Sequence, residues 1–479
     1  MKQMSNTYSE LVIVGSGPAG LSAAEEACRN NVCTTIIDMN KKFGGQFYSQ
    51  LQDDAAVDES FLAKNDVDRN SIEGRIFIDR IKKTAANIIS NATVWGIFPG
   101  NEIAYVKDGK TYKIKYEKLI LAEGVVEKPL PFPGWTLPGV YTAGGAQKLL
   151  KTYRVRPGKK VLLAGSGPIL LALACQLISA GVKIAAILET ASFYDYVISM
   201  RPKHVVSAFQ NHRIILEGVN YIYRIKKANV PIRLSHAIIS AAGRNQVEKV
   251  TYARIDRHGV PIKGSEKEME VDAVCIHHGF QSSNSLAKLA GCRHQYNETS
   301  QNIIPVHDSF METDIDGIFV AGDMTSAEGR LTALEEGRIA AIRVSRQLGK
   351  ISLAEETKRT EQAIRKILTY SFFSGYLNKV HAVKTGLYSR ITTDTIICRC
   401  EELSAAHILN TSSIQRNINL NEIKKITRAG MGYCQGRTCS GIIASLVALK
   451  KGEKSEEIGR INSREPVYPI RIEEMIQND

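Results

Sequence analysis

The sequence lacks any long apolar run. None of its apolar stretches reaches the roughly 18 residues that a membrane-spanning helix needs, so we expect no transmembrane segment. The opening residues, MKQMSNTYSE, are polar and do not resemble a secretory leader, which predicts a cytoplasmic location. Peripheral contact with the inner face of a membrane stays open as an alternative.

Aromatic residues are also few, at 7% of the chain, and arginines never gather in a run interleaved with aromatics. This pattern argues against the usual nucleic-acid-binding surfaces, although the formal net charge is +13. Because lysine and arginine are spread along the whole chain, the charge indicates a solvated basic surface. We therefore expect no nucleic-acid partner.

Cysteine is scarce and unevenly placed. Most of the nine cysteines are scattered in apolar or helical contexts, which are typical of small buried side chains. The other four, Cys398, Cys400, Cys434 and Cys439, share one short segment. In a reducing compartment structural disulfides are not expected, so clustered thiols indicate a metal site. No C-x-x-C motif follows the first glycine-rich turn, which disfavours a disulfide-exchanging enzyme with a redox thiol pair there.

The 479 residues are enough for two or three domains. Near the start, LVIVGSGPAGLSAAEEACRNNVCTTIIDMN predicts a buried strand over 11–14, a tight turn, a helix and a second strand. The glycine spacing fits a dinucleotide fingerprint, with phosphates at the helix N-terminus and a ribose held by an acid after the second strand. The candidate binding residues are Gly15, Gly17, Pro18, Ala19, Gly20 and Asp38.

Two later segments decide between a flavin and a nicotinamide at this turn. KKFGGQ, residues 41–46, offers a bulky ring a close backbone approach at Gly45 and Gln46. TDIDGIFVAGDMTSAEGRLTALEEGRIAA, residues 313–341, predicts a strand and then a helix after Gly322–Asp323. It resembles the second flavin signature of the glutathione-reductase-like superfamily. That resemblance implies FAD, with Asp323 at its ribityl and pyrophosphate region and the helix directed at the flavin pyrimidine.

A third segment, YEKLILAEGVVEKPLPFPGW at 116–135, resembles the strand and hinge of the same superfamily and includes Gly124 among the cofactor residues. Glu123 stands where the superfamily usually has threonine, so we expect its hydrogen bonds to differ while the topology is kept. The implied fold is α/β, with two dinucleotide-binding domains and a small helical domain at the C-terminal end.

The pattern of strand, turn, helix and strand recurs in GKKVLLAGSGPILLALACQLISAGVKIAAILET, residues 158–190. Gly165 and Gly167 are present and Glu189 stands at the ribose position, but Leu170 replaces the third glycine. We expect this leucine to push the helix and the strand apart and to shift the phosphate site. NAD(P)H, another nucleotide and no ligand at all remain open for this unit.

The cysteine segment has the spacing C-x-C-x33-C-x4-C, with helices expected over 403–410 and 440–450 after the two pairs. Helix N-termini stabilise thiolates, and Arg399 and Arg437 add positive charge. Because C-x-C is tighter than a standard zinc knuckle, a [2Fe–2S] cluster is favoured over structural zinc, which stays the alternative. CRCEE and TRAGMGYCQGRTC also resemble the [2Fe–2S] segment of bacterioferritin-associated ferredoxins.

Over residues 8–450 the chain looks like the larger subunits of bacterial heteromeric amino-acid dehydrogenases: opine oxidases, D-hydroxyproline dehydrogenases, dye-linked proline dehydrogenases and hydrogen cyanide synthase. LPFPGWTLPGVYTAGGAQ and GMGYCQGRTC carry much of this resemblance. It implies FAD and a [2Fe–2S] cluster in this chain and leaves room for an FMN at a subunit interface. It also implies a smaller flavoprotein partner of the D-amino-acid-oxidase type and leaves room for a further small subunit. The alpha subunit of heterotetrameric sarcosine oxidase is similar in part, without this four-cysteine pattern.

The sequence therefore predicts an electron-transfer subunit that passes electrons from a partner's opine, proline or hydroxyproline substrate to an external acceptor. No catalytic side-chain constellation stands out. A self-sufficient NAD(P)H-dependent reductase and a flavin-free scaffold with a zinc site are the alternatives. The expected domains are FAD-binding (1–155 and 285–345), inserted NAD(P)-binding-like (156–284), helical bridge (346–390), [2Fe–2S] (391–455) and C-terminal tail (456–479).

Overall fold

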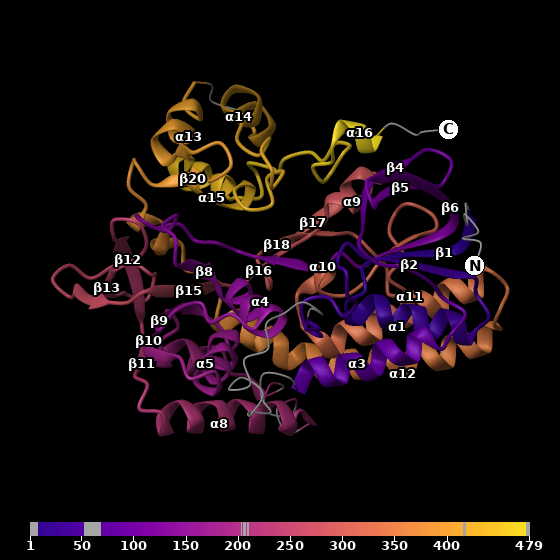
Figure 1. The fold of residues 1–479 in the computed structure, drawn as a ribbon, viewed down its shortest axis with the longest axis horizontal. Coiled ribbons are helices and arrows are strands. Elements are labelled where there is room, and N and C mark those ends of the chain that lie inside the picture. Colours follow the sequence, from indigo (N-terminus) through magenta and orange to yellow (C-terminus); the bar gives the residue numbers. More distant parts are fainter. Residues whose placement is uncertain are drawn as a thin grey trace.

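The computed structural model describes residues 8–51, 69–202, 204, 207, 210–414 and 418–475. Two large α/β parts lie side by side, and a small, mostly helical part lies against both of them (Figure 1). Each of the two large parts is organised around its own sheet of mainly parallel strands.

The first sheet has seven strands in the order β3-β2-β1-β6-β5-β4, with β19 added beside β6. Its elements are β1 Tyr8–Val14, α1 Pro18–Arg29, β2 Thr34–Ile37, α3 Arg69–Lys82, β3 Asn87–Ile89, β4 Ala92–Phe98, β5 Glu102–Lys107, β6 Lys110–Leu121, β19 Ile318–Val320, α10 Asp323–Ser326 and α11 Arg330–Gln347. β1, β2, β3 and β19 pair in parallel, whereas β4, β5 and β6 form an antiparallel meander. α1 and α11 pack along each other beneath this sheet (Figure 1). Leu11 and Ile13 are fully buried there, as expected where helices cover a parallel sheet.

The second sheet is wholly parallel, in the order β11-β10-β9-β15-β8. Its elements are β8 Val140–Thr142, α4 Ala143–Tyr153, β9 Lys160–Ser166, α5 Ile169–Ser179, β10 Lys183–Glu189, α6 Phe193–Ser199, α8 His212–Lys227, β11 Ile232–Leu234 and β15 Ala273–His278. One face is covered by a three-stranded antiparallel sheet, β12 His236–Ala242, β13 Lys249–Arg254 and β14 Lys267–Glu270. The predicted boundary at residue 155 falls inside this part, because β8 pairs with β15 and α4 packs against α5.

The chain passes between the two large parts at a short antiparallel pair, β7 Val125–Glu127 and β16 Phe280–Ser282. After the second crossing come α9 Ser285–Leu289, β17 His294–Asn297 and β18 Asn302–Pro305. The longest helix, α12 Leu353–Val380, starts at a capping box formed by Ser352 and Glu355. It packs against α11 and reaches α6, so its C-terminal end lies at the second large part. A 3-10 helix, η1 Thr385–Arg390, follows.

The small part contains β20 Ile396–Cys398, β21 Leu403–Ser404, α13 Ala405–Thr411, α14 Leu420–Thr427 and α15 Ser440–Lys451. These elements share a hydrophobic core that also takes in Ile458 and Ile461, from the segment predicted to be a tail. The chain then returns to the first sheet, where the Val467 N–H donates to the Trp95 carbonyl at 3.0 Å. The last helix, α16 Ile472–Met475, lies beside β6 (Figure 1).

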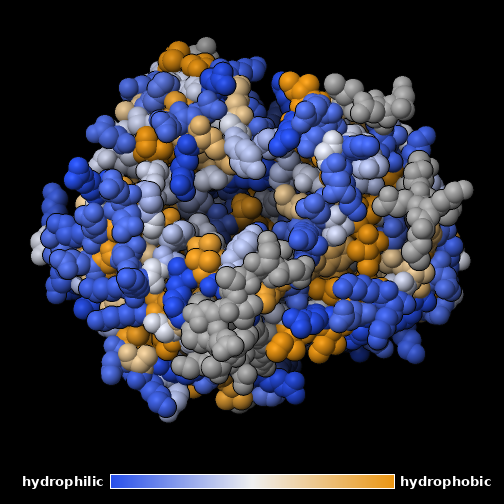
Figure 2. Space-filling view, viewed as in Figure 1, coloured by the Kyte–Doolittle hydropathy of each residue, from blue (hydrophilic) through white to orange (hydrophobic). Residues whose placement is uncertain are grey.

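Polar residues dominate the face seen in Figure 2, and apolar ones are scattered singly or in small groups. The same view shows a hollow near the centre of this face, between the small part above and the two large parts below. Within the described ranges, no helix combines the length and the apolar character that crossing a bilayer requires.

Candidate functional site

At the first glycine-rich turn, the glycines leave backbone atoms exposed without side chains above them. A Cβ on Gly15, which has φ +104°, would collide with the Ala122 carbonyl, and one on Gly20 would collide with the Gly15 carbonyl. A Cβ on Gly17 would meet nothing within 4 Å, so the space in front of the turn is open. α1 begins at Pro18 and directs its N-terminus into that space. This cradle fits the pyrophosphate of a dinucleotide.

Asp38 follows β2 and lies at the turn, as predicted. Its Oδ2 accepts from the N–H and the hydroxyl of Ser16, both at 2.6 Å. Its Oδ1 accepts from the N–H and the side-chain amide of Asn40, at 2.7 and 2.8 Å. These four bonds match the acceptor capacity of a carboxylate. Asp38 therefore holds the turn in shape, and a ribose hydroxyl would have to share one of its oxygens.

The 41–46 segment lies directly on the first turn. The Gly44 N–H donates to the Ser16 carbonyl at 3.0 Å, and a Cβ on Gly45 would lie 2.8 Å from the Gly17 Cα. Gly45 has φ +60° and Gln46 is exposed. The two segments, separated along the chain, thus form one continuous backbone surface, and the predicted approach of a flavin ring to Gly45 stays a prediction.

The 313–341 segment reaches the same place from the other side. Gly322 has φ +85°, and a Cβ there would lie 2.8 Å from the Ala19 Cβ. A Cβ on Gly337 would collide with the Ala19 carbonyl, so α11 can lie against α1 only because this position is glycine. The Asp323 carboxylate accepts from the Gly329 N–H, the N-cap residue of α11, at 2.9 Å. The structure therefore brings the N-termini of α1 and α11 together, where their positive ends favour an anionic ligand.

Buried carboxyl groups behind this surface were not identified from the sequence. Burial raises the pKa of Glu336 to about 8, and the nearby Glu328 and Asp323 add to the effect. Glu336 accepts from the Gly322 N–H at 2.7 Å and from the Thr325 hydroxyl. Burial also raises the pKa of Asp323. A glutamate inside a helix with no glycine motif around it gives no sequence signal that it will face a turn made by another segment.

The second glycine-rich turn differs from the first in its covering and in its backbone, since Gly17 has φ −68° and Gly167 has φ +117°. Gly165 has φ +137°, and the Gly167 N–H donates to the Glu189 Oε2 at 3.1 Å. The His381 Nδ1 lies 3.1 Å from the Ser166 hydroxyl and 3.7 Å from the Glu189 Oε1. The Tyr196 hydroxyl lies 3.5 Å from the other ring nitrogen. Side chains of this chain therefore occupy the ribose position of the second unit.

Glu189 is ionised in this arrangement. Burial raises the pKa of its carboxyl, but hydrogen bonds from His381 and from the N–H groups of Ala191 and Gly167 outweigh burial and hold the pKa below its ordinary value. Leu170, which replaces the third glycine, is 1% exposed and packs in the core of the second part. α5 consequently starts at Ile169, later relative to its turn than α1.

The four clustered cysteines meet at the mouth of α15. Their thiols form a chain of hydrogen-bonding contacts in the order Cys398, Cys439, Cys434 and Cys400. The Cys434 N–H lies 3.5 Å from the Cys400 sulfur. A Cβ on Gly432 would collide with the Cys400 Cβ, so this glycine is required for the loop to close over the first pair. Within the described ranges, no three or more His, Cys, Asp or Glu side chains surround a common point as they do around a single ion.

The surroundings favour the thiolate at Cys398 and Cys434 and the thiol at the other two cysteines. Burial raises the pKa of Cys400, and the hydrogen bonds to Cys398 and Cys434 raise the pKa of Cys439. A hydrogen bond from Cys439 and backbone N–H groups at Gly430, Glu401 and Cys400 lower the pKa of Cys398 to about 6. The Cys439 thiol and the Thr438 N–H lower the pKa of Cys434 as well. Thiolates held by backbone N–H groups are the donor set that iron–sulfur clusters use.

The two arginines of the cysteine segment also dock the small part. The Arg399 guanidinium lies over the Trp135 ring at 5.3 Å. The Arg437 guanidinium lies 3.8 Å from the Tyr468 ring centroid, and its carbonyl accepts from the Gln281 amide at 3.2 Å. The positive charge predicted for the thiols is thus shared with contacts to the rest of the chain.

Glu123 has its own hydrogen bonds, as its departure from the superfamily predicted. Its Oε1 accepts from the Leu286 N–H at 3.1 Å, at the start of α9. Burial raises the pKa of Glu123 to about 7, although the charge of Arg437 acts in the opposite direction. Glu123 precedes Gly124 of the predicted flavin site, and Arg437 lies between two of the clustered cysteines. The charge of Arg437 thus acts on a carboxyl group next to the predicted flavin site.

Comparison with known proteins gives a consistent picture. Residues 9–349 match the family described as pyridine nucleotide-disulphide oxidoreductase, and residues 397–477 match the sarcosine oxidase A3 domain. The A subunit of opine oxidase from Rhizobium meliloti is 29% identical over 98% of this chain and 88% of its own length. The HcnB subunit of hydrogen cyanide synthase from Pseudomonas protegens is 29% identical over 96% of each chain.

A solved structure shares the fold. L-proline dehydrogenase from P. horikoshii has a TM-score of 0.70, with 18% identity, covering 100% of this chain and 81% of that chain. The resemblance to larger subunits of heteromeric amino-acid dehydrogenases, first noted from the motifs, is confirmed by these relatives. The A3-domain match includes all four clustered cysteines and continues past the predicted end of their domain at residue 455. The chain belongs to the pyridine nucleotide-disulphide oxidoreductase family and is an FAD-dependent oxidoreductase.

Proposed function

We propose that this chain is the electron-transfer subunit of a heteromeric amino-acid dehydrogenase, carrying FAD at the first glycine-rich turn and a [2Fe–2S] cluster at the four cysteines. It would pass electrons from a smaller flavoprotein partner, which oxidises an opine, proline or hydroxyproline, to an external acceptor. The relatives are themselves named as subunits, of opine oxidase and of hydrogen cyanide synthase, which supports a subunit role.

The observation that carries the proposal is the chain of four thiols in contact with one another at the start of α15. When bound, FAD would supply two-electron acceptance and a [2Fe–2S] cluster would supply one-electron transfer. The C-x-C spacing of the first pair, tighter than a standard zinc knuckle, supports a [2Fe–2S] cluster over a single zinc ion.

At the flavin side, the residues of this chain bind and orient. Backbone at Gly15, Gly17, Pro18, Ala19 and Gly20 would receive the pyrophosphate, together with Gly45 and Gln46 on the opposite side. The N-terminus of α11, next to Gly322 and Asp323, would favour negative charge on the flavin. Gly124 has φ +68° and no neighbour where a Cβ would be, so its surface is free for a cofactor ring.

At the cysteine side, the chain excludes water from half of the site. Cys398 and Cys439 are each 1% exposed, whereas Cys400 is exposed and Cys434 is partly buried. The buried pair faces the core of the small part and the exposed pair faces outward. This asymmetry supports transfer to an acceptor that docks over Cys400 and Cys434.

The experiment is anaerobic purification of the chain alone and together with its partner, followed by measurement of flavin, iron and acid-labile sulfide. We expect FAD and two irons per chain, and no oxidation of opines or proline by the chain alone. Cys434→Ser should lose iron and keep FAD, whereas Cys33→Ser, an exposed cysteine outside the segment, should keep both. Zinc without iron, or substrate oxidation by the chain alone, would overturn the proposal.

A further inference from the structure

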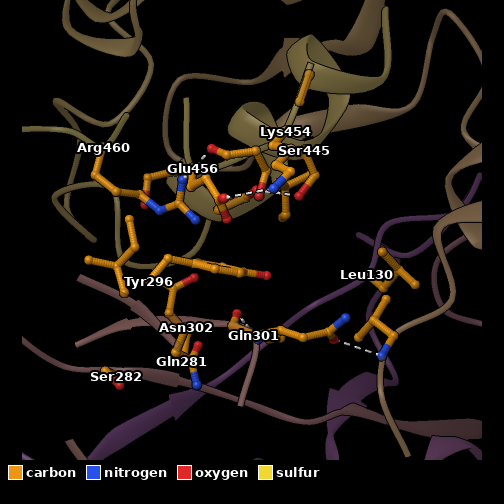
Figure 3. A pocket seen from close by; sticks show the side chains of 18 of the residues that line it. Leu130, Gln281, Ser282, Tyr296, Gln301, Asn302, Ser445, Lys454, Glu456 and Arg460 are labelled. Atoms are coloured by element: carbon orange, nitrogen blue, oxygen red, sulfur yellow. Dashed lines mark hydrogen bonds and ion pairs between the residues drawn. The ribbon is translucent and has the colours of Figure 1, made fainter. Parts of the chain in front are cut away.

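A cavity of about 390 Å³ lies where the two large parts and the small part meet. Its walls come from residues 128–130 after β7, from β16 and α9, from β17 and β18, from the segment around η1, and from α15 and the chain after it. Figure 3 shows Arg460 and Glu456 on one side, and Gln281, Ser282 and Asn302 on the other. Tyr296 lies between them, with its hydroxyl directed into the open centre. The volume is in the range of sites for small organic molecules.

The interior of this cavity is lined by cations without paired carboxylates. The Lys128 ammonium donates to the carbonyls of Gln301 and Ser300, at 2.7 and 3.3 Å. The Arg460 guanidinium donates to backbone carbonyls alone, those of Ser455 and Gly459. The Lys288 ammonium, near the end of α9, makes no hydrogen bond or ion pair with any residue that the structure describes.

The charge of Arg460 acts on both lysines. Burial and the charge of Arg460 lower the pKa of Lys128 to about 7 and that of Lys288 to about 8, and the more distant Glu123 only partly offsets the effect on Lys288. The acids that line the cavity are at its rim: Glu298 and Glu453 are exposed, and Glu456 pairs with the exposed Lys454 at 3.7 Å. Cations held near one another in this way are destabilising unless an anion lies between them.

Several polar atoms of the cavity wall also lack partners. Both side-chain atoms of Asn302, which is 2% exposed, make no hydrogen bond. The Ser282 hydroxyl and the His278 Nδ1 are likewise buried and unpaired. Buried polar groups in folded proteins almost always have a partner, so these atoms are arranged for a molecule that is not part of the chain.

We propose that this cavity binds a small organic anion whose phosphate or carboxylate group lies among Lys128, Lys288 and Arg460. Asn302 and Ser282 hydrogen-bond the rest of the molecule. The N-terminus of α15, which enters the wall at Ser440 and Gly441, adds a further positive end toward the anion. The cavity adjoins the candidate cluster site at Thr438 and Ser440, but its proposed ligand depends on neither cofactor assignment.

Because the cavity lies between the small part and the two large parts, its ligand should stabilise the contact between them. One wall contains Thr438 and Ser440, which flank Cys439, and the opposite wall contains Gln281 and Asn284 of the flavin half. A bound anion would therefore hold the small part against the rest of the chain. Its removal should loosen that contact before it affects either large part.

The first test is what the full-length protein carries. Protein purified in a buffer free of phosphate and carboxylates is denatured, and the released small molecules are identified by mass spectrometry. Thermal shift and calorimetry then compare inorganic phosphate, glycerol 3-phosphate and succinate, which distinguish a phosphate ligand from a carboxylate ligand. We expect a released anion, or a saturable stabilisation by one class of probe. No released anion and no stabilisation by any probe would overturn the proposal.

Substituted proteins distinguish a lysine that binds a ligand from a lysine that only stabilises the fold. Lys288→Met removes an unpaired, partly buried cation, so we expect the ligand-free protein to melt at a higher temperature while the probe binds at least about tenfold more weakly. Asn302→Leu, of similar volume, should weaken probe binding in the same direction. Lys425→Met, on an exposed part of α14, is the matched control and should change neither property. Equal probe affinity in Lys288→Met and in the unmodified chain would also overturn the proposal.

Discussion

The two glycine-rich turns of this chain have the same four residues, G-S-G-P, and differ in what covers them. Each follows a buried parallel strand, and in each the first glycine has a positive φ and no room for a Cβ beside a carbonyl of the neighbouring segment. Ser16 at the first turn donates to Asp38. Ser166 at the second turn faces His381. The same local sequence thus forms an open cradle in one place and a filled one in the other.

The third glycine position separates the two turns further. Gly20 lies so close to the Gly15 carbonyl that no side chain fits, and α1 begins directly at the turn. Leu170 fills the core beneath the second turn, and α5 begins one residue later relative to its turn. The later start of α5 has the direction expected for a leucine at this position, and the predicted shift of the phosphate site stays a prediction.

The largest expected effect comes from making the first turn resemble the second. Gly20→Ala places a Cβ against the Gly15 carbonyl, and because backbone cannot move away cheaply, we expect a loss of about 3 kcal/mol or more and protein without flavin. Urea unfolding and the flavin absorbance of the purified protein measure both. Gly17→Ala is the matched control, since its Cβ meets no protein atom. It should keep its folding stability and lose flavin affinity, and flavin retained by Gly20→Ala would contradict the comparison.

The next largest effect is on the binding of nicotinamide nucleotides at the second turn. Because His381 occupies the ribose position, we expect NADH and NADPH to reduce the flavin of the unmodified chain slowly and without saturation. His381→Ala frees Ser166 and Glu189, so nucleotide binding should become measurable by calorimetry. His258→Ala, at an exposed loop, is the control. Saturable reduction of the unmodified chain within turnover time would show that the second turn is open.

The difference between the two glycine-rich turns shows which features the sequence predicts and which it does not. Glycine spacing and buried strands predicted both turns, because they depend on residues within one short segment. The grouping of the four thiols was also predicted, since their spacing is specific, whereas the approach of Gly45 to Gly17 was not. His381 was not, because it comes from the end of a helix far along the chain and has no motif of its own. Glu336 and the cations of the interdomain cavity were missed for the same reason: burial by distant segments gives them their properties.

Two buried glutamates allow a pH test with opposite signs. Burial raises the pKa of Glu336 to about 8, so its contribution to stability is fully present below its unfolded pKa of about 4.5 and is lost as the pH rises through 8. Glu336→Gln should therefore be more stable than the unmodified chain at alkaline pH, by roughly 2–3 kcal/mol, and equal to it near the unfolded pKa.

At the second turn the sign reverses. The pKa of Glu189 lies below its ordinary value, so its contribution is present above that value and is lost as the pH falls through the lowered pKa. Glu189→Gln should be less stable than the unmodified chain at neutral pH and should approach it in acid. Urea unfolding across the pH range measures both variants, and the same sign for the two would contradict the assignment of their charge states.

The smallest expected effect separates two roles of Asp38. Asn40→Ala removes one of its four hydrogen bonds and should cost about 1 kcal/mol of stability. If Asp38 only holds the turn, flavin affinity should fall slightly along with that stability. If it also binds the ribose, the freed oxygen accepts the hydroxyl without competition, and affinity should stay level or rise. Ser16→Ala, which removes a bond to the other oxygen, is the matched comparison. The dissociation constant for FAD, measured by fluorescence for each variant, decides between an acid that shapes the first turn and one that also contacts its ligand.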